Sequence, residues 1–211
     1  MSLRQHYYPP LLENTYYHIY NRGNNGDNLF YRPENYVYFL RLFDYYLTAY
    51  LETYAFCLLP NHFHLLIRIK NFDTLPEPAK RLQHGLKVLE TPEAVISEQF
   101  RRFFIAYAKA IKKQEDRTGS LFEKNFRRKA VTSDRYFTNL IAYIHRNPQL
   151  HGIWPDFQSY PYSSYERILI PRQTNLRKQE VLNWFGSEED YRSVHTSGYS
   201  YRTIVNLTIE E

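Results

Sequence analysis

The sequence predicts an α+β protein: a ferredoxin-like antiparallel sheet with helices on one face, followed by a tyrosine-bearing helix and a tail. Three observations predict this fold class. Four short segments are rich in strand-forming residues, two longer segments repeat apolar residues at helical spacing, and the six alternate as strand-helix-strand-strand-helix-strand. With 211 residues, 43% of them hydrophobic, the chain can bury a substantial core.

The elements before residue 71 form the first three strands and the first helix. Gly and Asn residues after residue 22 favour a turn that ends the first strand, and Pro33 suits the opening position of a helix. The dipeptide Pro60–Asn61 is short enough to join two strands as a hairpin. In chain order we expect a strand, a helix and two strands, over residues 15–21, 34–50, 52–59 and 62–70.

The sequence pattern that indicates helices and strands is less regular after residue 70. Residues 71–97 are rich in Pro and polar residues, which predicts a loop or insertion with room for a short helix. Ser133 is a good helix N-cap and Pro148 a helix terminator, so these two residues bound the predicted tyrosine-bearing helix. The remaining elements are a helix, a basic strand, the tyrosine-bearing helix and a short helix in the tail, over residues 98–114, 121–131, 134–146 and 179–184.

These elements divide the chain into a domain over residues 1–170 and a C-terminal extension over residues 171–211. The extension contains no motif that indicates a function. Docking on the core, covering a sheet edge and binding DNA are three open roles for it, and its acidic end argues against the last.

Charge and composition narrow the classes of function. The formal net charge is +5, and residues 100–135 hold eleven Lys and Arg against four acids. This basic stretch suits a polyanionic partner, although such a net charge also fits many ordinary proteins. The single cysteine, Cys57, excludes an internal disulfide and a cysteine-based zinc site. Because no apolar run is long enough to span a membrane and the first ten residues lack a signal-peptide core, we expect a cytoplasmic, nucleoid-associated protein without a membrane partner.

The strongest candidates for a reactive site are two histidines in the third predicted strand, LLPNHFHLLIRIK. Side chains alternate between the faces of a strand, so Phe63 points to the helix-covered core while His62 and His64 point to the other side. Imidazoles commonly bind divalent metals. From spacing alone, a metal site and a pair of exposed or hydrogen-bonded histidines are equally good interpretations. If Ile19 faces the core, His18 lies on the side of the pair, where it serves either the site or the structure.

The tyrosine-bearing helix offers a second set of candidates. Asn139, Tyr143 and Asn147 recur every four residues and therefore share one helix face, apart from the apolar stripe. From this face the Tyr143 hydroxyl and the Asn147 amide oxygen can reach one ligand. The alternative is a half-buried tyrosine and an asparagine that caps the helix before Pro148, and the pattern by itself favours it. With 21 tyrosines in the chain, one tyrosine alone carries little weight.

Five motifs occur in order along the chain: YYHIYNRGNN, LLPNHFHLLI, SLFEKNFRRKAV, YIHRNP and YPYSSY. Together they resemble the single-tyrosine HUH transposases, closest to the REP-associated tyrosine transposases, over residues 15–165. The resemblance implies a ferredoxin-like core that cuts single-stranded DNA beside a hairpin, forms a 5′-phosphotyrosine link and rejoins strands without ATP. It assigns His62 and His64 as metal ligands, Tyr143 as the nucleophile and Asn147 as the third metal-binding side chain.

The residue types agree with the chemistry that the resemblance implies. A divalent ion withdraws charge from a scissile phosphate and orients it, and Mg²⁺ or Mn²⁺ suits phosphate and imidazole ligands together. A tyrosine hydroxyl has an ordinary pKa of roughly 10, so it needs activation by the metal or by a nearby base. We expect His18 to support the metal ligands as a neighbouring group. The expected DNA contacts are basic side chains of the fourth strand and the second helix: Lys124, Arg127, Arg128, Lys129, Arg101 and Arg102.

The expected partner is single-stranded or hairpin DNA. Some branches of this superfamily exchange the tyrosine helix between subunits, so a homodimer and a monomer are both open. Two other functions also stay open: a DNA-binding protein of the same fold without catalytic turnover, and a metal-dependent enzyme that acts on a small phosphorylated substrate. The basic stretch and the absence of a Gly-rich phosphate loop count against the small substrate.

Overall fold

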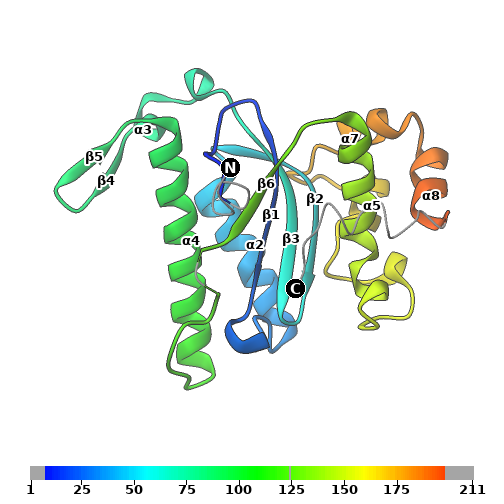
Figure 1. The fold of residues 1–211 in the computed structure, drawn as a ribbon, viewed down its shortest axis with the longest axis horizontal. Coiled ribbons are helices and arrows are strands. Elements are labelled where there is room, and N and C mark those ends of the chain that lie inside the picture. The colour runs from blue at the N-terminus through cyan, green and yellow to red at the C-terminus, as the bar shows by residue number, and fades with distance from the viewer. Residues whose placement is uncertain (1–7, 124, 198–211) are drawn as a thin grey trace.

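The computed structural model describes residues 8–123 and 125–197, and its centre is an antiparallel sheet (Figure 1). The strand order is β2-β3-β1-β6, with every neighbouring pair antiparallel. A helix follows the first strand and another precedes the last, so the predicted ferredoxin-like fold class is confirmed. The strands of this sheet are β1 (Tyr16–Arg22), β2 (Leu51–Leu59), β3 (His62–Ile69) and β6 (Arg127–Val131).

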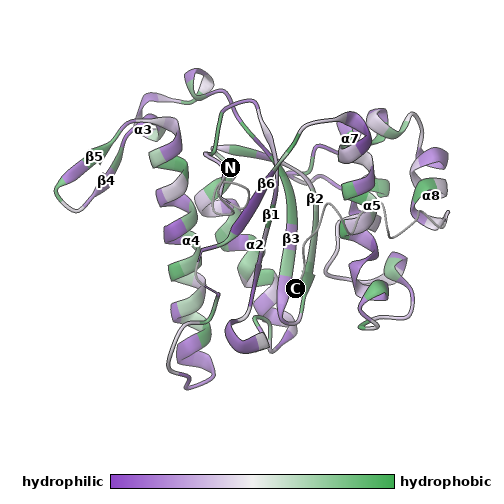
Figure 2. Ribbon diagram, viewed as in Figure 1, coloured by the Kyte–Doolittle hydropathy of each residue, from purple (hydrophilic) through white to green (hydrophobic). Residues whose placement is uncertain are grey.

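Two long helices, α2 (Pro33–Leu47) and α4 (Pro92–Gln114), pack side by side on one face of the sheet. Phe39 of α2 meets Phe103 of α4 edge-on, and both are fully buried above the strands. Figure 2 shows the contrast within the sheet: β6 is its hydrophilic strand. The main core therefore lies between these helices and the inner strands, and β6 carries mainly basic side chains.

The opposite face of the sheet is covered in part by helix α5 (Asp134–Leu150), which lies over β2 and β3. Ser133 caps this helix as predicted, because its side chain accepts a hydrogen bond from the backbone N–H of Tyr136. The apolar stripe of α5 forms a second core with the residues of β2 and β3 that point away from α2 and α4; its members include Phe137, Leu140, Ile141, Ile144 and Leu66.

Helix α5 also continues past the predicted end. It runs through Pro148 to Leu150, although a proline inside a helix removes one backbone donor and usually costs about 3 kcal/mol. The packing of α5 on the sheet outweighs that cost, and Asn147 reinforces the last turns: its side-chain amide donates to the Tyr143 carbonyl, at 2.9 Å. The backbone N–H of His151 then donates to the Asn147 carbonyl at the helix end.

The predicted fourth strand is shorter than expected. Only Arg127–Val131 pairs along β1, and the chain before it makes a single bridge between Phe122 and Gly23. Asn125 has a φ of 62°, in the left-handed region, so the backbone turns there and cannot continue a strand. Position 124 lies outside the described residues.

The segment before α4 holds more structure than its composition predicted. It contains a short helix, α3 (Glu77–Lys80), and a two-stranded hairpin of β4 (Leu82–His84) and β5 (Lys87–Leu89). Helix α4 then begins at Pro92, because Thr91 serves as its N-cap. Figure 1 shows the hairpin projecting from the body of the molecule beyond α4.

The C-terminal extension packs on α5 and on the edge of β2. Leu176 forms a parallel bridge with Thr53, so part of the extension covers that edge. Val181 and Tyr191 are fully buried in the second core. Among the residues the structure describes, no helix is both long and apolar enough to cross a membrane. The helices after α5 are α6 (Tyr165–Leu169), α7 (Lys178–Phe185) and α8 (Glu188–Thr196).

Candidate functional site

The strand register places the predicted histidines on the face that α5 covers in part. On β3, Phe63 and Leu65 belong to the core beneath α2 and α4, so the alternation turns His62 and His64 to the other side. His64 stands opposite Tyr20 on β1, and Tyr20 stands opposite a basic residue of β6. A single row across three strands therefore joins imidazole, phenol and guanidinium groups.

His18 contacts this pair directly. Its Nε2 lies 2.9 Å from His64 Nδ1, a hydrogen bond in which the tautomers decide which ring donates. The two rings are stacked, with 5.1 Å between their centroids, and both are almost fully buried. Across the sheet His18 pairs with Lys129 of β6. His18, the predicted neighbour of the histidine pair, is thus hydrogen-bonded to His64.

His62 is oriented from the turn before it. Its Nδ1 lies 2.7 Å from Oδ1 of Asn61, and because an amide oxygen can only accept, Nδ1 carries the proton. The His62 and His64 rings are nearly perpendicular, with 5.3 Å between their centroids. In both rings, then, Nδ1 is hydrogen-bonded to a neighbouring side chain. Nε2 is therefore the ring nitrogen to consider as a metal ligand.

Tyr143 of α5 packs against the same group. Its ring lies edge-on to His64, with 5.5 Å between the centroids, and 6.4 Å from the centroid of His18. Only 3% of the tyrosine surface is exposed. The phenol and the histidines that the sequence singled out therefore meet within one chain.

Asn147 lies one turn further along α5 and is fully buried. Its Oδ1 is 3.1 Å from Nε2 of His151, whose ring centroid in turn lies 5.0 Å from that of His62. Asn139, two turns earlier, has a buried Oδ1 without a hydrogen-bond partner among the described residues. His151 escaped the sequence analysis, yet its spacing of four residues from Asn147 is the signal that would have placed it on the same face.

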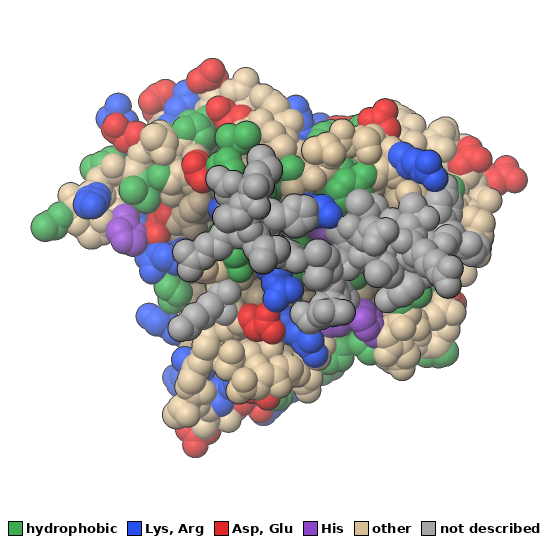
Figure 3. Space-filling model, viewed as in Figure 1, with side chains coloured by type: hydrophobic (Ala, Val, Ile, Leu, Met, Phe, Trp, Pro, Cys, Tyr) green, Lys and Arg blue, Asp and Glu red, His purple; other side chains and the backbone are tan. Residues whose placement is uncertain are grey.

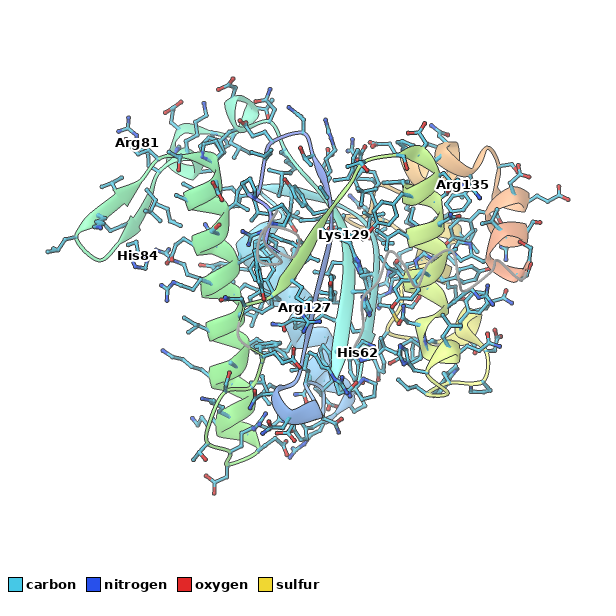
Figure 4. All side chains as sticks on the ribbon, in the orientation of Figure 1. His62, Arg81, His84, Arg127, Lys129 and Arg135 are labelled. Carbon is cyan, nitrogen blue, oxygen red and sulfur yellow. The ribbon has the colours of Figure 1, made fainter. Side chains whose placement is uncertain are left out.

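A pocket of about 520 Å³ opens beside this group. Tyr143 and Asn147 are not among the residues that line it. Figure 4 shows His62, Arg127 and Lys129 in the middle of the molecule; His62 lies on β3 and the two basic residues lie on β6, with β1 between these strands. The lining consists of turn residues, imidazoles and charged groups, among them Tyr20, Arg22, Asn61, His62, His64, Glu123, Arg127 and His151.

The predicted DNA-binding residues of β6 divide between the two faces. Arg127 lines the pocket and pairs with Glu123 at 3.6 Å. Lys129 shares that face, with its ammonium 5.7 Å from the centre of the Tyr136 ring, and burial lowers the pKa of its amine. Arg128 faces the other side, where its Nε donates to the Pro9 carbonyl and burial lowers the pKa of its guanidinium. Lys124 lies outside the described residues.

The other two predicted DNA contacts belong to α4, away from the pocket. Arg101 and Arg102 both pair with the buried carboxylate of Glu98. The hydrogen bonds from Arg101, and then those from Arg102 and His84, hold the pKa of Glu98 at about 2 against the cost of burial. Glu98 is thus a structural partner of both arginines.

The predicted donor set for a metal is two imidazoles and an amide. Within residues 8–123 and 125–197, no group of three or more His, Cys, Asp or Glu side chains is placed to hold a metal ion. The predicted set does not depend on such a group, because its third member is the amide of Asn147. Both imidazoles have Nδ1 bonded to a neighbour, which is the usual way a metal-binding histidine is held so that Nε2 faces the ion.

The fold and this site define a class of protein. It is a ferredoxin-like domain in which a histidine pair on a central strand meets a tyrosine from the helix that follows the last strand. That is the arrangement implied by the resemblance to single-tyrosine HUH transposases.

Comparisons with known proteins point to one branch of that class. A curated protein of Haemophilus influenzae, named for the REP-associated tyrosine transposases, is 27% identical over 118 residues, or 55% of this chain. The match spans about 60% of the length of that relative. A solved structure of the REP-associated tyrosine transposase bound to a REP hairpin superposes with a TM-score of 0.55 and 18% identity, over 80% of this chain and 86% of the other. No protein-family model matches. The resemblance predicted from the five motifs is confirmed.

Proposed function

We propose that this protein is a metal-dependent DNA strand-cleaving and rejoining enzyme, a transposase of the REP-associated tyrosine type with Tyr143 as nucleophile. One observation carries the proposal: the Tyr143 ring packs against His64 in the same chain, beside a pocket that also holds His62 and Arg127. The relative named for these transposases and the fold of the hairpin-bound structure support it. We propose single-stranded or hairpin DNA as the substrate.

The metal ligands in this proposal are His62, His64 and Asn147. Mg²⁺ or Mn²⁺ fits the set, since hard ions suit phosphate oxygens and imidazole favours Mn²⁺ somewhat. When bound, the ion would withdraw charge from the scissile phosphate. The amide oxygen of Asn147 already accepts from His151, and as an amide oxygen it has a second lone pair with which it could also hold a metal ion.

The side chains of the chain itself have separate tasks. Arg127 and Lys129 place positive charge on the face where the DNA backbone lies, which favours the phosphate and its developing charge. The Tyr143 oxygen attacks the phosphorus atom and forms an O–P bond. The phenol gives up its proton as this bond forms, the bond to the 3′ oxygen breaks, that oxygen takes up a proton and leaves as a 3′ hydroxyl, and the 5′ phosphate stays on the tyrosine. Attack by a 3′ hydroxyl reverses these steps and rejoins a strand.

A DNA-binding protein of the same fold without turnover is the second candidate. Two observations favour it: Tyr143 is 3% exposed, and it is absent from the residues that line the pocket. Cleavage therefore requires the phenol to reach a phosphate held beyond the histidines. Hairpin DNA binding without cleavage in any divalent metal would support this second candidate.

Covalent trapping tests the proposal. The protein is incubated with a 3′-labelled hairpin oligonucleotide that carries a single-stranded 5′ flank, with Mn²⁺ or Mg²⁺, and resolved under denaturing conditions. We expect a metal-dependent protein–DNA adduct that is lost in Tyr143→Phe and in His62→Ala. Tyr136→Phe is the matched control, because Tyr136 lies on the same helix. An adduct that survives Tyr143→Phe would reassign the nucleophile.

A further inference from the structure

The hairpin of β4 and β5 ends in exposed apolar side chains. Leu86, at its turn, is completely exposed, and 55% of Val88 is exposed. Gly85 beside it has a φ of 58°, a conformation that glycine adopts without strain, so it allows the tight turn at which Leu86 lies. Figure 3 shows hydrophobic atoms at the projecting tip of the hairpin. Exposing a leucine fully in this way gives the isolated fold no stability.

The hairpin is fixed to α4 by polar contacts. A two-stranded hairpin alone is marginally stable in water, so its position depends on such anchors. His84 Nδ1 lies 2.9 Å from the Glu98 carboxylate, which is only 5% exposed, and Arg102 joins the same carboxylate at 2.9 Å. The Arg102 guanidinium also donates to the Gln83 carbonyl. The tip is therefore held in a defined direction beyond the end of α4.

The surface that continues from the hairpin is basic. Residues 80–113 contain eight Lys and Arg against three Glu, a local charge of +5 that equals the formal net charge of the whole chain. Arg101, Lys109 and Lys113 are exposed at intervals of eight and four residues along α4, so they form one row about 18 Å long. In Figure 3, Lys and Arg side chains line the edge of the molecule over α4.

We propose that the β4–β5 hairpin and this α4 row bind double-stranded DNA, with Leu86 as an apolar wedge against the base pairs. The inference rests on the proposed function, since it assigns the paired stem of a hairpin substrate to this surface. Duplex DNA carries one negative charge per roughly 1.7 Å, which complements a row of cations. DNA-bending proteins insert leucine and similar side chains between base steps of the minor groove. Two isolated apolar side chains bury too little area for a stable contact with a second copy.

Binding measurements on two DNA forms test this surface. Fluorescence anisotropy is recorded against salt for a hairpin oligonucleotide and for an unpaired strand of equal length. We expect Leu86→Ser to weaken hairpin binding about tenfold. We expect Lys109→Gln with Lys113→Gln to lower the salt slope on the hairpin by about two. Neither change should alter binding of the unpaired strand. Val37→Ser and Arg192→Gln, at exposed positions on α2 and α8, are the matched controls.

A stacking probe reads the wedge directly. With 2-aminopurine in the stem, wild-type protein should raise its fluorescence as the base unstacks, and Leu86→Ser should not. Hairpin affinity and fluorescence that are unchanged in Leu86→Ser would overturn the proposal, as would equal losses on both DNA forms or binding of the tip to vesicles of anionic lipid. The adduct formed by wild-type protein on the same hairpin reports the proposed enzymatic function separately. If the wild-type protein forms no adduct but the hairpin-specific effects of the substitutions remain, the proposed enzymatic function is rejected and the proposed binding surface stands.

Discussion

The Tyr143 ring lies edge-on to the His64 ring, at 78° and with 5.5 Å between their centroids, and both residues belong to one chain. A helix that arrives after the last strand of the sheet thereby meets a histidine from its central strand. Nothing in this contact needs a second subunit. It makes the tyrosine and the histidine pair parts of one site, and its chemical role can be tested residue by residue.

His18 should tune metal affinity without binding the metal. Its Nε2 holds His64 Nδ1, so we expect His18→Gln to lower Mn²⁺ affinity about 10- to 100-fold, as for other groups that orient a metal-binding histidine. Calorimetric titration with Mn²⁺ measures the change. His195→Gln, at an equally buried histidine in the α5–α8 contact, is the control and should leave Mn²⁺ affinity near wild type. Equal effects of both changes would assign His18 to stability alone.

Asn147 and His151 are two candidates for the third metal-binding side chain of the proposed site. Because His151 donates to the Asn147 amide oxygen, we expect His151→Ala to leave Mn²⁺ affinity unchanged or higher, and Asn147→Ala to lower it at least tenfold. The same titration separates them. The reverse order of effects would make His151 the ligand and Asn147 its support.

Arg127 and Arg128 form a natural pair of charge variants, since they are adjacent and face opposite sides of β6. We expect Arg127→Gln to weaken DNA binding and to reduce the slope of log affinity against log salt by about 0.7 to 0.9, the value of one lost phosphate contact. Arg128→Gln should lower thermal stability instead, because its guanidinium supports the Pro9 carbonyl. Anisotropy and thermal melting distinguish the two, and an equal loss of salt slope in both variants would contradict the assignment of faces.

The contact between α5 and α8 should make folding sensitive to mild acid. His195 Nδ1 donates to the Tyr191 carbonyl, so its Nε2 accepts from His145 Nδ1, and His145 Nε2 then accepts from Ser164. Burial lowers the pKa of His195 to about 4, and burial with the neighbouring His195 lowers the pKa of His145 as well. Both rings are therefore neutral in the folded protein.

The unfolded chain binds these protons more readily, since an exposed histidine has an ordinary pKa near 6.5. The free energy of unfolding should hence fall as the pH drops from about 6.5 toward 4, by up to roughly 1.4 kcal/mol per pH unit for each histidine. Glu98, with its pKa at about 2, loses its contribution only below pH 4.5. Urea unfolding between pH 7 and 4.5 measures the slope. His195→Gln should flatten it, and an unchanged slope would show that other groups are responsible.

The fold was predictable because its pattern is strong and local. Strand alternation placed Phe63 in the core and His64 on the other face, and Ser133 marked the start of α5. That His18 lies near His64 followed from the ferredoxin-like strand order, in which β1 and β3 are neighbours. The resemblance suggested the chemical roles proposed for these side chains, and the strand and helix periods predicted the faces on which they lie.

What the sequence analysis missed depends on tertiary contacts. Helix α5 passes Pro148 because packing against β2 and β3 outweighs a local preference, and this extra turn is what carries His151 to the pocket. The β4–β5 hairpin is short and held by Glu98, a residue that composition marks only as a surface charge. Arg128 looked equivalent to Arg127 in a basic run, but neighbours on a strand face opposite sides.

Peptide mapping of the trapped adduct tests the central claim most directly, because the chain has 21 tyrosines and the attachment site names the nucleophile. The wild-type protein is reacted with hairpin DNA and Mn²⁺, digested with protease and nuclease, and analysed by mass spectrometry. The account predicts a nucleotide on the peptide that contains Tyr143 and on no other tyrosine. A nucleotide on a different residue, or hairpin binding that never yields a covalent product, would contradict it.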